Sequence, residues 1–130
     1  MPNVCHNTLI ISGNISEIIS KSKGDFPKNF HYDCLFSKFF PPPENADEEW
    51  YVINWGNTKD AWFSEDWKQD EEKNKAVIYF DSAWVPATHF VYKLSKMYKD
   101  VSFCLDYCVY ESCIQGSIKF SGGEEVAEGR

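Results

Sequence analysis

The first hydrophobic run of the chain predicts a strand followed by a helix. Residues 8–12 are mostly apolar and β-branched, as in a strand, and Gly13 ends the run. Isoleucines at helical spacing then predict a helix that ends near Gly24. These isoleucines are Ile15, Ile18 and Ile19. The next stretch, residues 26–40, is aromatic and without periodicity, and we expect it to be irregular.

The second half of the chain predicts a strand, a helix and two further strands. Residues 76–80 form a continuous β-rich run. Pro86 suits the first turn of a helix, and apolar side chains at helical spacing extend this helix to about Lys99. Residues 101–110 alternate with a period of two, and residues 113–120 supply a fourth strand. This order predicts an α+β domain in which two helices cover one face of an antiparallel sheet of about four strands.

Between these halves lies a segment that is acidic and rich in tryptophan. The acidic band, residues 44–72, holds ten of the twenty acidic residues and four of the five tryptophans, against two lysines. Residues 48–55 predict one or two helical turns before Gly56, and the rest of the band is expected to be an irregular insert. Two arrangements fit this composition. The tryptophans pack in the core beneath a solvated acidic surface, or exposed tryptophans anchor a basic partner.

Length and composition indicate one intracellular domain. The 130 residues suffice for a single core, which we assign to residues 1–121, followed by a polar acidic tail over residues 122–130. No apolar run is long enough to span a membrane, and the N-terminus lacks the basic and hydrophobic regions of a secretion signal. We therefore expect a cytoplasmic protein whose five cysteines stay reduced.

The charge of the chain argues against direct binding to nucleic acid. The formal net charge is −7, and the only arginine is the last residue, Arg130. Arginine makes the bidentate contacts that recognise phosphate and guanine, and an acidic surface repels the phosphate backbone. We therefore expect partners other than DNA or RNA.

The sequence indicates neither a metal site nor a catalytic centre. Cys104 and Cys108 lie four residues apart on a predicted strand, about 13 Å at 3.3 Å per residue, which is too far for a shared zinc ion. His6 follows Cys5 directly, so on a strand the two side chains point to opposite faces. We expect no enzymatic activity, no metal and no cofactor.

Three short motifs resemble the YubB-type ferredoxin-like domain family. Residues 2–13 resemble its opening, with Val4 where the family usually has tryptophan. Residues 54–61, Asn-Trp-Gly-Asn-Thr-Lys-Asp-Ala, resemble its N-W-G-T-K-x-D-A signature, with Asn57 as an apparent one-residue departure. Residues 80–86, Phe-Asp-Ser-Ala-Trp-Val-Pro, resemble its F-x-T-A-W-x-P segment.

The resemblance implies a ferredoxin-like sandwich without an iron–sulfur cluster. It also implies a protein carried by a phage, a plasmid or another mobile element, and therefore a bacterial host. It implies no activity, because the family has no established one.

The last two motifs also suggest a ligand pocket. A flat ring could stack between tryptophans from both motifs while polar groups fix it. The residues of this candidate pocket are Asn54, Trp55, Lys59, Asp60 and Trp84. In the structural alternative, the indole packs against the sheet, and Asn54 and Asp60 satisfy backbone groups of the loop.

These observations predict a non-enzymatic binding protein. We expect it to come from a phage or another mobile element and to inhibit a host defence protein that has a basic surface. The residues expected to bind that partner are Glu48, Glu49, Asp60, Glu65, Asp66, Trp67, Asp70, Glu71 and Glu72. The alternative is a small-ligand binder that sequesters a nucleotide-type signalling molecule in the candidate pocket. A structural component that forms a homo-oligomer also stays open, since the sequence does not predict the oligomeric state.

Overall fold

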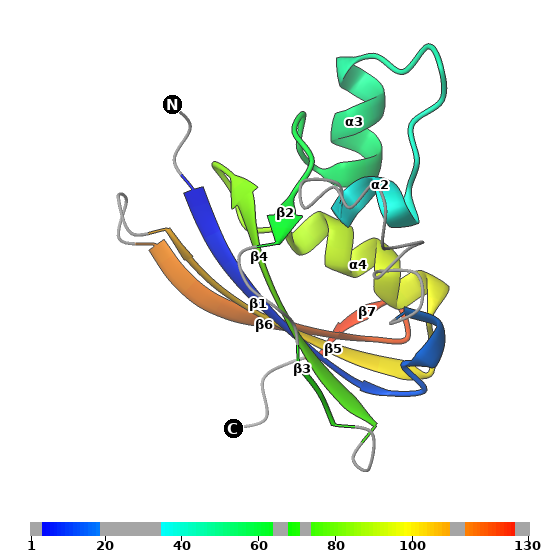
Figure 1. Ribbon diagram of the computed structural model, residues 1–130, viewed down its shortest axis with the longest axis vertical. Helices are drawn as coiled ribbons and strands as arrows, with labels where there is room; N and C mark the ends of the chain where they lie inside the picture. Colours follow the sequence, from blue (N-terminus) through cyan, green and yellow to red (C-terminus); the bar gives the residue numbers. More distant parts are fainter. Residues whose placement is uncertain (1–3, 19–34, 64–67, 71–73, 110–113, 127–130) are drawn as a thin grey trace.

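The computed structural model of the chain describes residues 4–18, 35–63, 68–70, 74–109 and 114–126. Its strands and helices occur in separate runs along the chain (Figure 1), as expected for an α+β domain. In chain order they are β1 (Val4–Gly13), α2 (Leu35–Phe39), α3 (Glu48–Trp55), β2 (Trp62–Phe63), β3 (Lys68–Asp70), β4 (Lys75–Ala83), α4 (Thr88–Met97), β5 (Val101–Val109), β6 (Ile114–Ser121) and β7 (Glu124–Val126).

The strands form one antiparallel sheet with β1 near its centre. The strand order is β2-β4-β1-β5-β6-β7, and β3 also pairs with β4. The antiparallel sheet is confirmed, but the expected number of about four strands is wrong, since the described residues form seven strands of this sheet. The additional strands β2, β3 and β7 lie at the edges and are too short to produce a recognisable alternation. Part of the expected C-terminal tail thus joins the sheet as β7.

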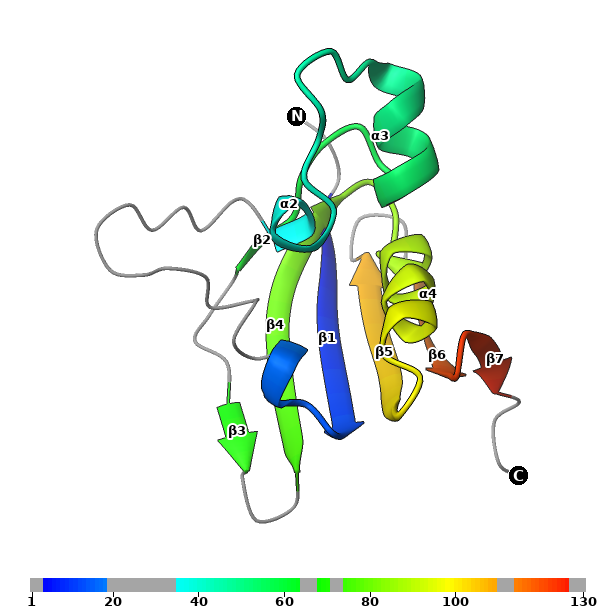
Figure 2. The same cartoon turned by 90° about the vertical axis from the view of Figure 1, so that its right-hand side faces the viewer.

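The described helices lie on one side of the sheet (Figure 2). Helices α2 and α4 cover one face, and α3 stands near the end where β1 begins. Helix α3 confirms the helical turns expected before Gly56. Helix α2 lies at the end of a stretch that was expected to be irregular, so that expectation is wrong for Leu35–Phe39. Of the helix expected after β1, residues 16–18 are helical, and Gly24 lies outside the described residues.

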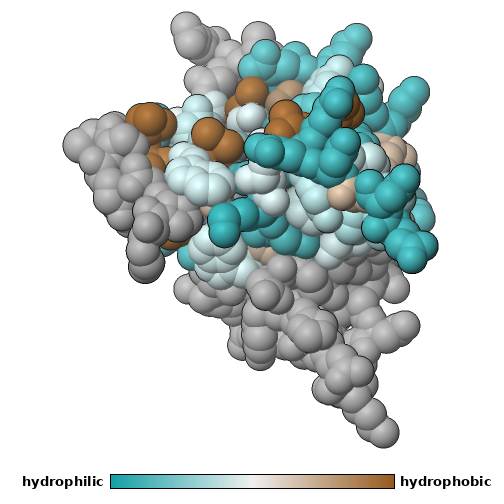
Figure 3. Space-filling model, turned by 90° about the horizontal axis from the view of Figure 1, so that it is seen from above, coloured by the Kyte–Doolittle hydropathy of each residue, from teal (hydrophilic) through white to brown (hydrophobic). Residues whose placement is uncertain are grey.

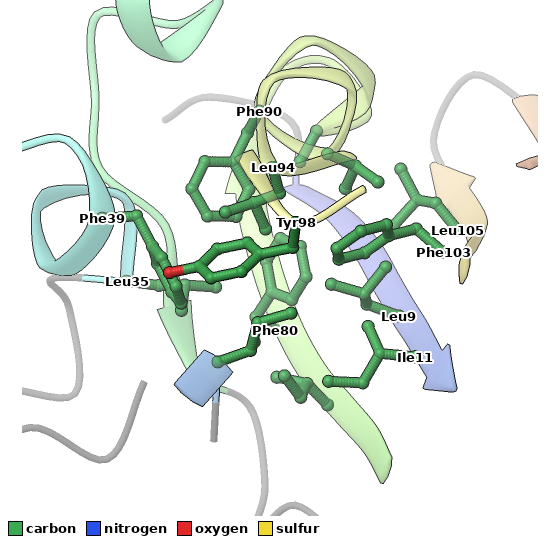
Figure 4. Close-up of a cluster of buried hydrophobic side chains, with 14 of the residues drawn as sticks. Leu9, Ile11, Leu35, Phe39, Phe80, Phe90, Leu94, Tyr98, Phe103 and Leu105 are labelled. Carbon is green, nitrogen blue, oxygen red and sulfur yellow. The ribbon is translucent and has the colours of Figure 1, made fainter. Parts of the chain in front are cut away.

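The core fills the space between the helices and the sheet. Alternate residues of the central strands are buried on the helix-covered face, as the period-two pattern predicted for β5. Figure 4 shows these side chains meeting those of the two covering helices. The labelled core residues are Leu9, Ile11, Leu35, Phe39, Phe80, Phe90, Leu94, Tyr98, Phe103 and Leu105. The opposite face of the sheet carries no described helix (Figures 1 and 2).

None of the described helices has the length and hydrophobicity that a membrane-spanning helix requires.

Candidate functional site

Asp60, a predicted partner- or ligand-binding residue, accepts hydrogen bonds at the start of α2. Its carboxylate accepts hydrogen bonds from the backbone N–H groups of Phe36 at 2.6 Å, Ser37 at 3.2 Å and Ala61 at 2.8 Å. The first turn of a helix has free N–H groups, and an aspartate satisfies them. Burial raises the pKa of Asp60, and these hydrogen bonds oppose the rise. Asp60 therefore connects the end of the acidic band to α2.

Trp55 and Asn54 fix the last turn of α3. Trp55 is 6% exposed, and its indole N–H donates to the carbonyl of Phe40 at 2.9 Å. Its ring packs against Phe36. The Asn54 side chain donates to the carbonyl of Trp50 and accepts a hydrogen bond from Lys93 Nζ, each at 2.9 Å. Both side chains thus have structural partners on neighbouring elements.

The turn after α3 requires a glycine and a buried asparagine. Gly56 ends the helix with φ at +73°, and a Cβ at this position would lie 2.6 Å from Cβ of His89. Asn57 is buried, donates to the carbonyl of Ala83 at 2.7 Å and accepts from the Lys59 N–H at 3.1 Å. The turn is therefore anchored to the end of β4.

Asn7 of β1 connects the end of β4 to the start of α4. It lies on the core face of β1, where the neighbouring inward positions are apolar, and it is 2% exposed. Its Nδ2 donates to the Cys5 carbonyl at 3.2 Å and to Ser82 Oγ at 2.9 Å. Its Oδ1 accepts from the Ala87 N–H at 3.2 Å. Sequence reasoning missed Asn7 and Asn57, although a polar residue at a core-facing position of an apolar strand was a usable signal for Asn7.

This network presents Trp84 to solvent. Ser82 Oγ donates to the Val85 carbonyl at 2.7 Å, and the Val85 N–H donates to the Ala83 carbonyl at 2.7 Å. Trp84, between these hydrogen bonds, has φ at +65° and is 45% exposed. Lys59 Nζ lies 6.0 Å from the centroid of its ring. Of the predicted pocket residues, the structure brings Lys59 and Trp84 together, while Trp55 lies in the core.

Further exposed apolar side chains occur near this corner. Val85 follows Trp84, and Val52 and Ile53 lie on α3, with exposures of 46%, 50% and 58%. His89 Nε2 hydrogen-bonds to the carbonyl of Ile53 at 2.6 Å, which joins α3 to the first turn of α4. Figure 3, seen from above, shows hydrophobic atoms exposed at this end among polar ones. We term Val52, Ile53, Trp84 and Val85 the apolar end.

The structure describes only part of the predicted acidic surface. Glu48 and Glu49 are exposed in the first turn of α3, next to Asp47, which caps the helix by accepting from the Trp50 N–H at 2.9 Å. Asp70 lies in β3 opposite Lys75. The remaining predicted residues lie outside the described residues: Glu65, Asp66, Trp67, Glu71 and Glu72.

The described histidines, cysteines and acids include no group of three or more that could hold a metal ion. On the open face of the sheet, His6 Nδ1 lies 2.9 Å from Asp81 Oδ1. Cys5, Cys104 and Cys108 are free thiols, of which Cys5 is buried. Burial raises the pKa of the Cys5 thiol, so its reactive thiolate form is disfavoured.

Comparison with known proteins identifies the domain. The family model for the ferredoxin-like domain in Api92-like protein matches residues 61–129. The crystal structure of a protein api92 from Yersinia pseudotuberculosis is similar, with a TM-score of 0.49 and 18% identity over 67% of this chain. The similarity covers 33% of that protein, so this chain spans about a third of its length. A search of the curated proteins found no match.

The family match begins at the start of β2 and includes the two outer strands β6 and β7, while the central strand β1 precedes it. The ferredoxin-like fold implied by the three motifs is thereby confirmed, and the YubB-type assignment stays a prediction. Because the family model covers more than half of the 130 residues, the chain belongs to the Api92-like family through its ferredoxin-like domain.

Proposed function

We propose that this chain is a non-enzymatic protein-binding module that docks through its apolar end. In this proposal it is carried by a phage or another mobile element and inhibits a host defence protein in the bacterial cytoplasm. The observation that carries the proposal is Trp84, a large aromatic residue that is exposed and held at a positive φ.

The backbone at Trp84 is costly for any residue except glycine. A left-handed conformation costs an L-residue about 1–2 kcal/mol, and a bulky side chain at positive φ is a genuine outlier. Such conformations concentrate at binding sites, where the surrounding structure holds them in place. Here the Ser82 and Asn57 hydrogen bonds fix the chain on both sides of Trp84. An exposed tryptophan on a rigid backbone loses little entropy on binding and suits the anchor of an interface.

The negative charge of the chain supports a partner that has a basic surface. Glu48 and Glu49 are exposed on the same helix that carries Val52 and Ile53, and the whole chain has a net charge of −7. A complementary partner would offer an apolar pocket for Trp84 with lysine or arginine around it. Long-range attraction between such surfaces accelerates association and falls with ionic strength.

The mobile-element origin and the inhibitory role rest on the resemblance to the YubB-type family and on the acidic character of a small chain. They specify the biological setting of the proposed interface. The interface itself is argued from Trp84 and its neighbours.

The experiment is native mass spectrometry of the tagged protein purified gently from a bacterial host. We expect a host protein to co-purify, to be released by salt, and to be lost in Trp84→Ala. The matched control is Val126→Ala, which truncates an exposed apolar residue on β7, outside the apolar end. Glu48→Lys with Glu49→Lys should weaken the complex and flatten its dependence on salt.

Two results would contradict the proposal. Equal loss of the partner in Trp84→Ala and Val126→Ala would mean that the apolar end is not the interface. A bound mass of a few hundred daltons, lost in Trp84→Ala and Lys59→Gln without any host protein, would favour the nucleotide-type ligand instead.

A further inference from the structure

The face of the sheet that carries no described helix has a hollow near the end of β1. The hollow measures about 450 Å³ and is lined by residues of β1, β4, β5, β6 and β7. This volume lies within the range of small-molecule sites, about 300–1,000 Å³. Ala83 pairs with Val4 near Trp84, and Lys75 pairs with Ser12 at the hollow. These positions lie eight residues apart on β4, about 26 Å at 3.3 Å per residue, so the hollow is separate from the apolar end.

One row of side chains across the hollow consists of hydroxyl groups. Ser12 pairs with Ser102, and Ser102 pairs with Ser121 on the next strand. Directly opposed residues of antiparallel strands place their side chains on the same face, with Cβ atoms about 5 Å apart. Lys75 stands opposite Ser12 in this row, and Asp70 of β3 pairs with Lys75. Three hydroxyls and an ammonium group therefore stand in line, and all four side chains line the hollow.

The neighbouring row supplies apolar contact and a second lysine. Ile10 pairs with Cys104, and Cys104 pairs with Lys119. Ile10 and Cys104 are half-buried although they point away from the core. Val126 of β7 pairs with Lys119 and adds an exposed apolar side chain at the rim. The floor of the hollow is thus apolar, with one lysine at each side.

The charged side chains that line the hollow are opposite in sign to the net charge of the whole chain. Among the described residues that line it, the charged ones are Lys75 and Lys119. Among the described residues, the nearest carboxylates by register are Asp70, opposite Lys75, Glu124, opposite Ser121, and Asp106, two residues along β5 from Cys104. All three lie outside the lining, so the charged side chains within it are the two lysines. Within the hollow, Lys75 and Lys119 attract an anionic ligand at short range, although the whole chain has a net charge of −7.

We propose that this hollow binds a small organic phosphate, a second function that does not depend on the protein-binding role of the apolar end. Lys75 and Lys119 supply the positive charge for the phosphate, and the hydroxyls of Ser12, Ser102 and Ser121 donate hydrogen bonds to its oxygens. Ile10 and Cys104 contact the apolar body of the ligand. A phosphate fits this set better than a carboxylate because it has more acceptor oxygens for donors that come from several strands.

The test is a titration of the ¹⁵N-labelled full chain with phenyl phosphate, followed by amide chemical shifts. We expect saturable shifts confined to the strand ends around Ser12, Ser102 and Ser121. Lys75→Gln with Lys119→Gln should raise the dissociation constant at least tenfold. Lys99→Gln, which removes an exposed lysine between α4 and β5, is the matched control and should leave it unchanged. A dispersed amide spectrum of each variant establishes that it is folded.

Two comparison ligands test the phosphate-binding part and the apolar part of the site separately. Inorganic phosphate and benzoate should each bind at least fivefold more weakly than phenyl phosphate, because each lacks one of the matched groups. The proposal is overturned if the shifts map elsewhere, if the double variant binds as tightly as Lys99→Gln, or if benzoate equals phenyl phosphate. Loss of the protein partner in Trp84→Ala has no bearing on this result, so the two proposals fail separately.

Discussion

Trp55 and Trp84 belong to two short motifs with similar polar neighbours, yet they occupy opposite environments. Trp55 ends α3, is 6% exposed and donates to the Phe40 carbonyl. Trp84 follows β4, is 45% exposed and has φ at +65°. The first side chain joins the aromatic core between α2 and α3, whereas the second is held outward by hydrogen bonds made by other residues.

The role of each tryptophan in this protein therefore depends on the backbone that carries it. At Trp55 the indole itself makes the stabilising contacts. Around Trp84 the stabilising hydrogen bonds are made by Asn7, Asn57 and Ser82. The indole is therefore not needed for these contacts and is available for binding. Substitutions can test whether Trp55 stabilises the fold and whether Trp84 serves binding instead.

Trp55→Ala should have the largest effect on stability. Replacing a buried aromatic residue with alanine costs about 3–5 kcal/mol, from lost burial and the cavity that remains. The unpaired carbonyl of Phe40 adds to this cost. Urea unfolding measures the loss. A cost below about 1 kcal/mol, as expected for surface changes, would mean that Trp55 is not a core residue.

Asn7→Ala should have the second largest effect on stability. The substitution leaves the buried Ala87 N–H without its acceptor, which costs about 1–3 kcal/mol, and it removes the hydrogen bond from Asn7 to Ser82 Oγ, worth about 1 kcal/mol. We expect a loss of about 2–4 kcal/mol in urea unfolding. The control is Asn14→Ala, at an exposed asparagine that bonds to Asp100 at 3.3 Å. Equal effects at both positions would show that the buried network does not support the Trp84 backbone.

Gly56→Ala tests how α3 meets α4. The new Cβ would need a left-handed backbone and would lie 2.6 Å from the Cβ of His89, so we expect a cost of about 2–3 kcal/mol. Gly122→Ala is a matched control, because its φ is +64° and no atom lies within 4 Å of the added Cβ. Gly122→Ala should cost only the strain of a left-handed backbone at alanine, about 1 kcal/mol. Thermal or urea unfolding of both variants gives the difference, which vanishes if His89 can move aside freely.

Local periodicity predicted the long elements but not the edges of the sheet. The alternation of residues 101–110 identified β5 because one of its faces is buried along its length. Strands β2 and β7 have two and three residues, so their positions follow from pairing with β4 and β6 rather than from any pattern of their own. Pairing partners distant in the sequence are not visible in local composition.

The candidate site was predictable only in part for the same reason. The two tryptophan motifs were recognised, but their burial depends on contacts between distant segments, such as Asn57 with Ala83. Asp60 was predicted either to bind a partner or a ligand or to satisfy backbone groups of its loop, and its role at α2 depends on a chain reversal that brings Phe36 to its carboxylate. The hydroxyl row of the hollow exists only through the register of four strands.

Asp60→Asn should have a smaller effect that changes with pH. Asparagine keeps one acceptor oxygen for the α2 N–H groups, so the loss should be about 1 kcal/mol, as for a helix cap. Burial raises the pKa of Asp60 above its ordinary value of 3.8, so the folded state favours the neutral carboxyl. The stability that this provides is present below pH 3.8 and is lost as the pH rises through the folded-state pKa.

Since asparagine does not titrate, the cost of Asp60→Asn should be largest at acid pH and shrink as the pH rises. Urea unfolding of both proteins across this range measures the difference, in which the other carboxylates cancel. A cost that grows with pH would mean that the three N–H donors outweigh burial at this carboxylate.

Trp84→Gly should have the smallest effect on stability and the largest on binding. Glycine adopts the left-handed backbone without strain, which recovers about 1–2 kcal/mol. The half-buried indole loses a similar amount of packing and its contact with Lys59, so the free energy of unfolding should change by less than about 1 kcal/mol. Urea unfolding measures this change, and co-purification of the host partner measures binding. If Trp84→Gly unfolds the protein, the indole is a structural residue like Trp55 and the proposed anchor is lost. If the variant is stable but binds no partner, a residue that folding does not require is kept in a strained conformation for recognition.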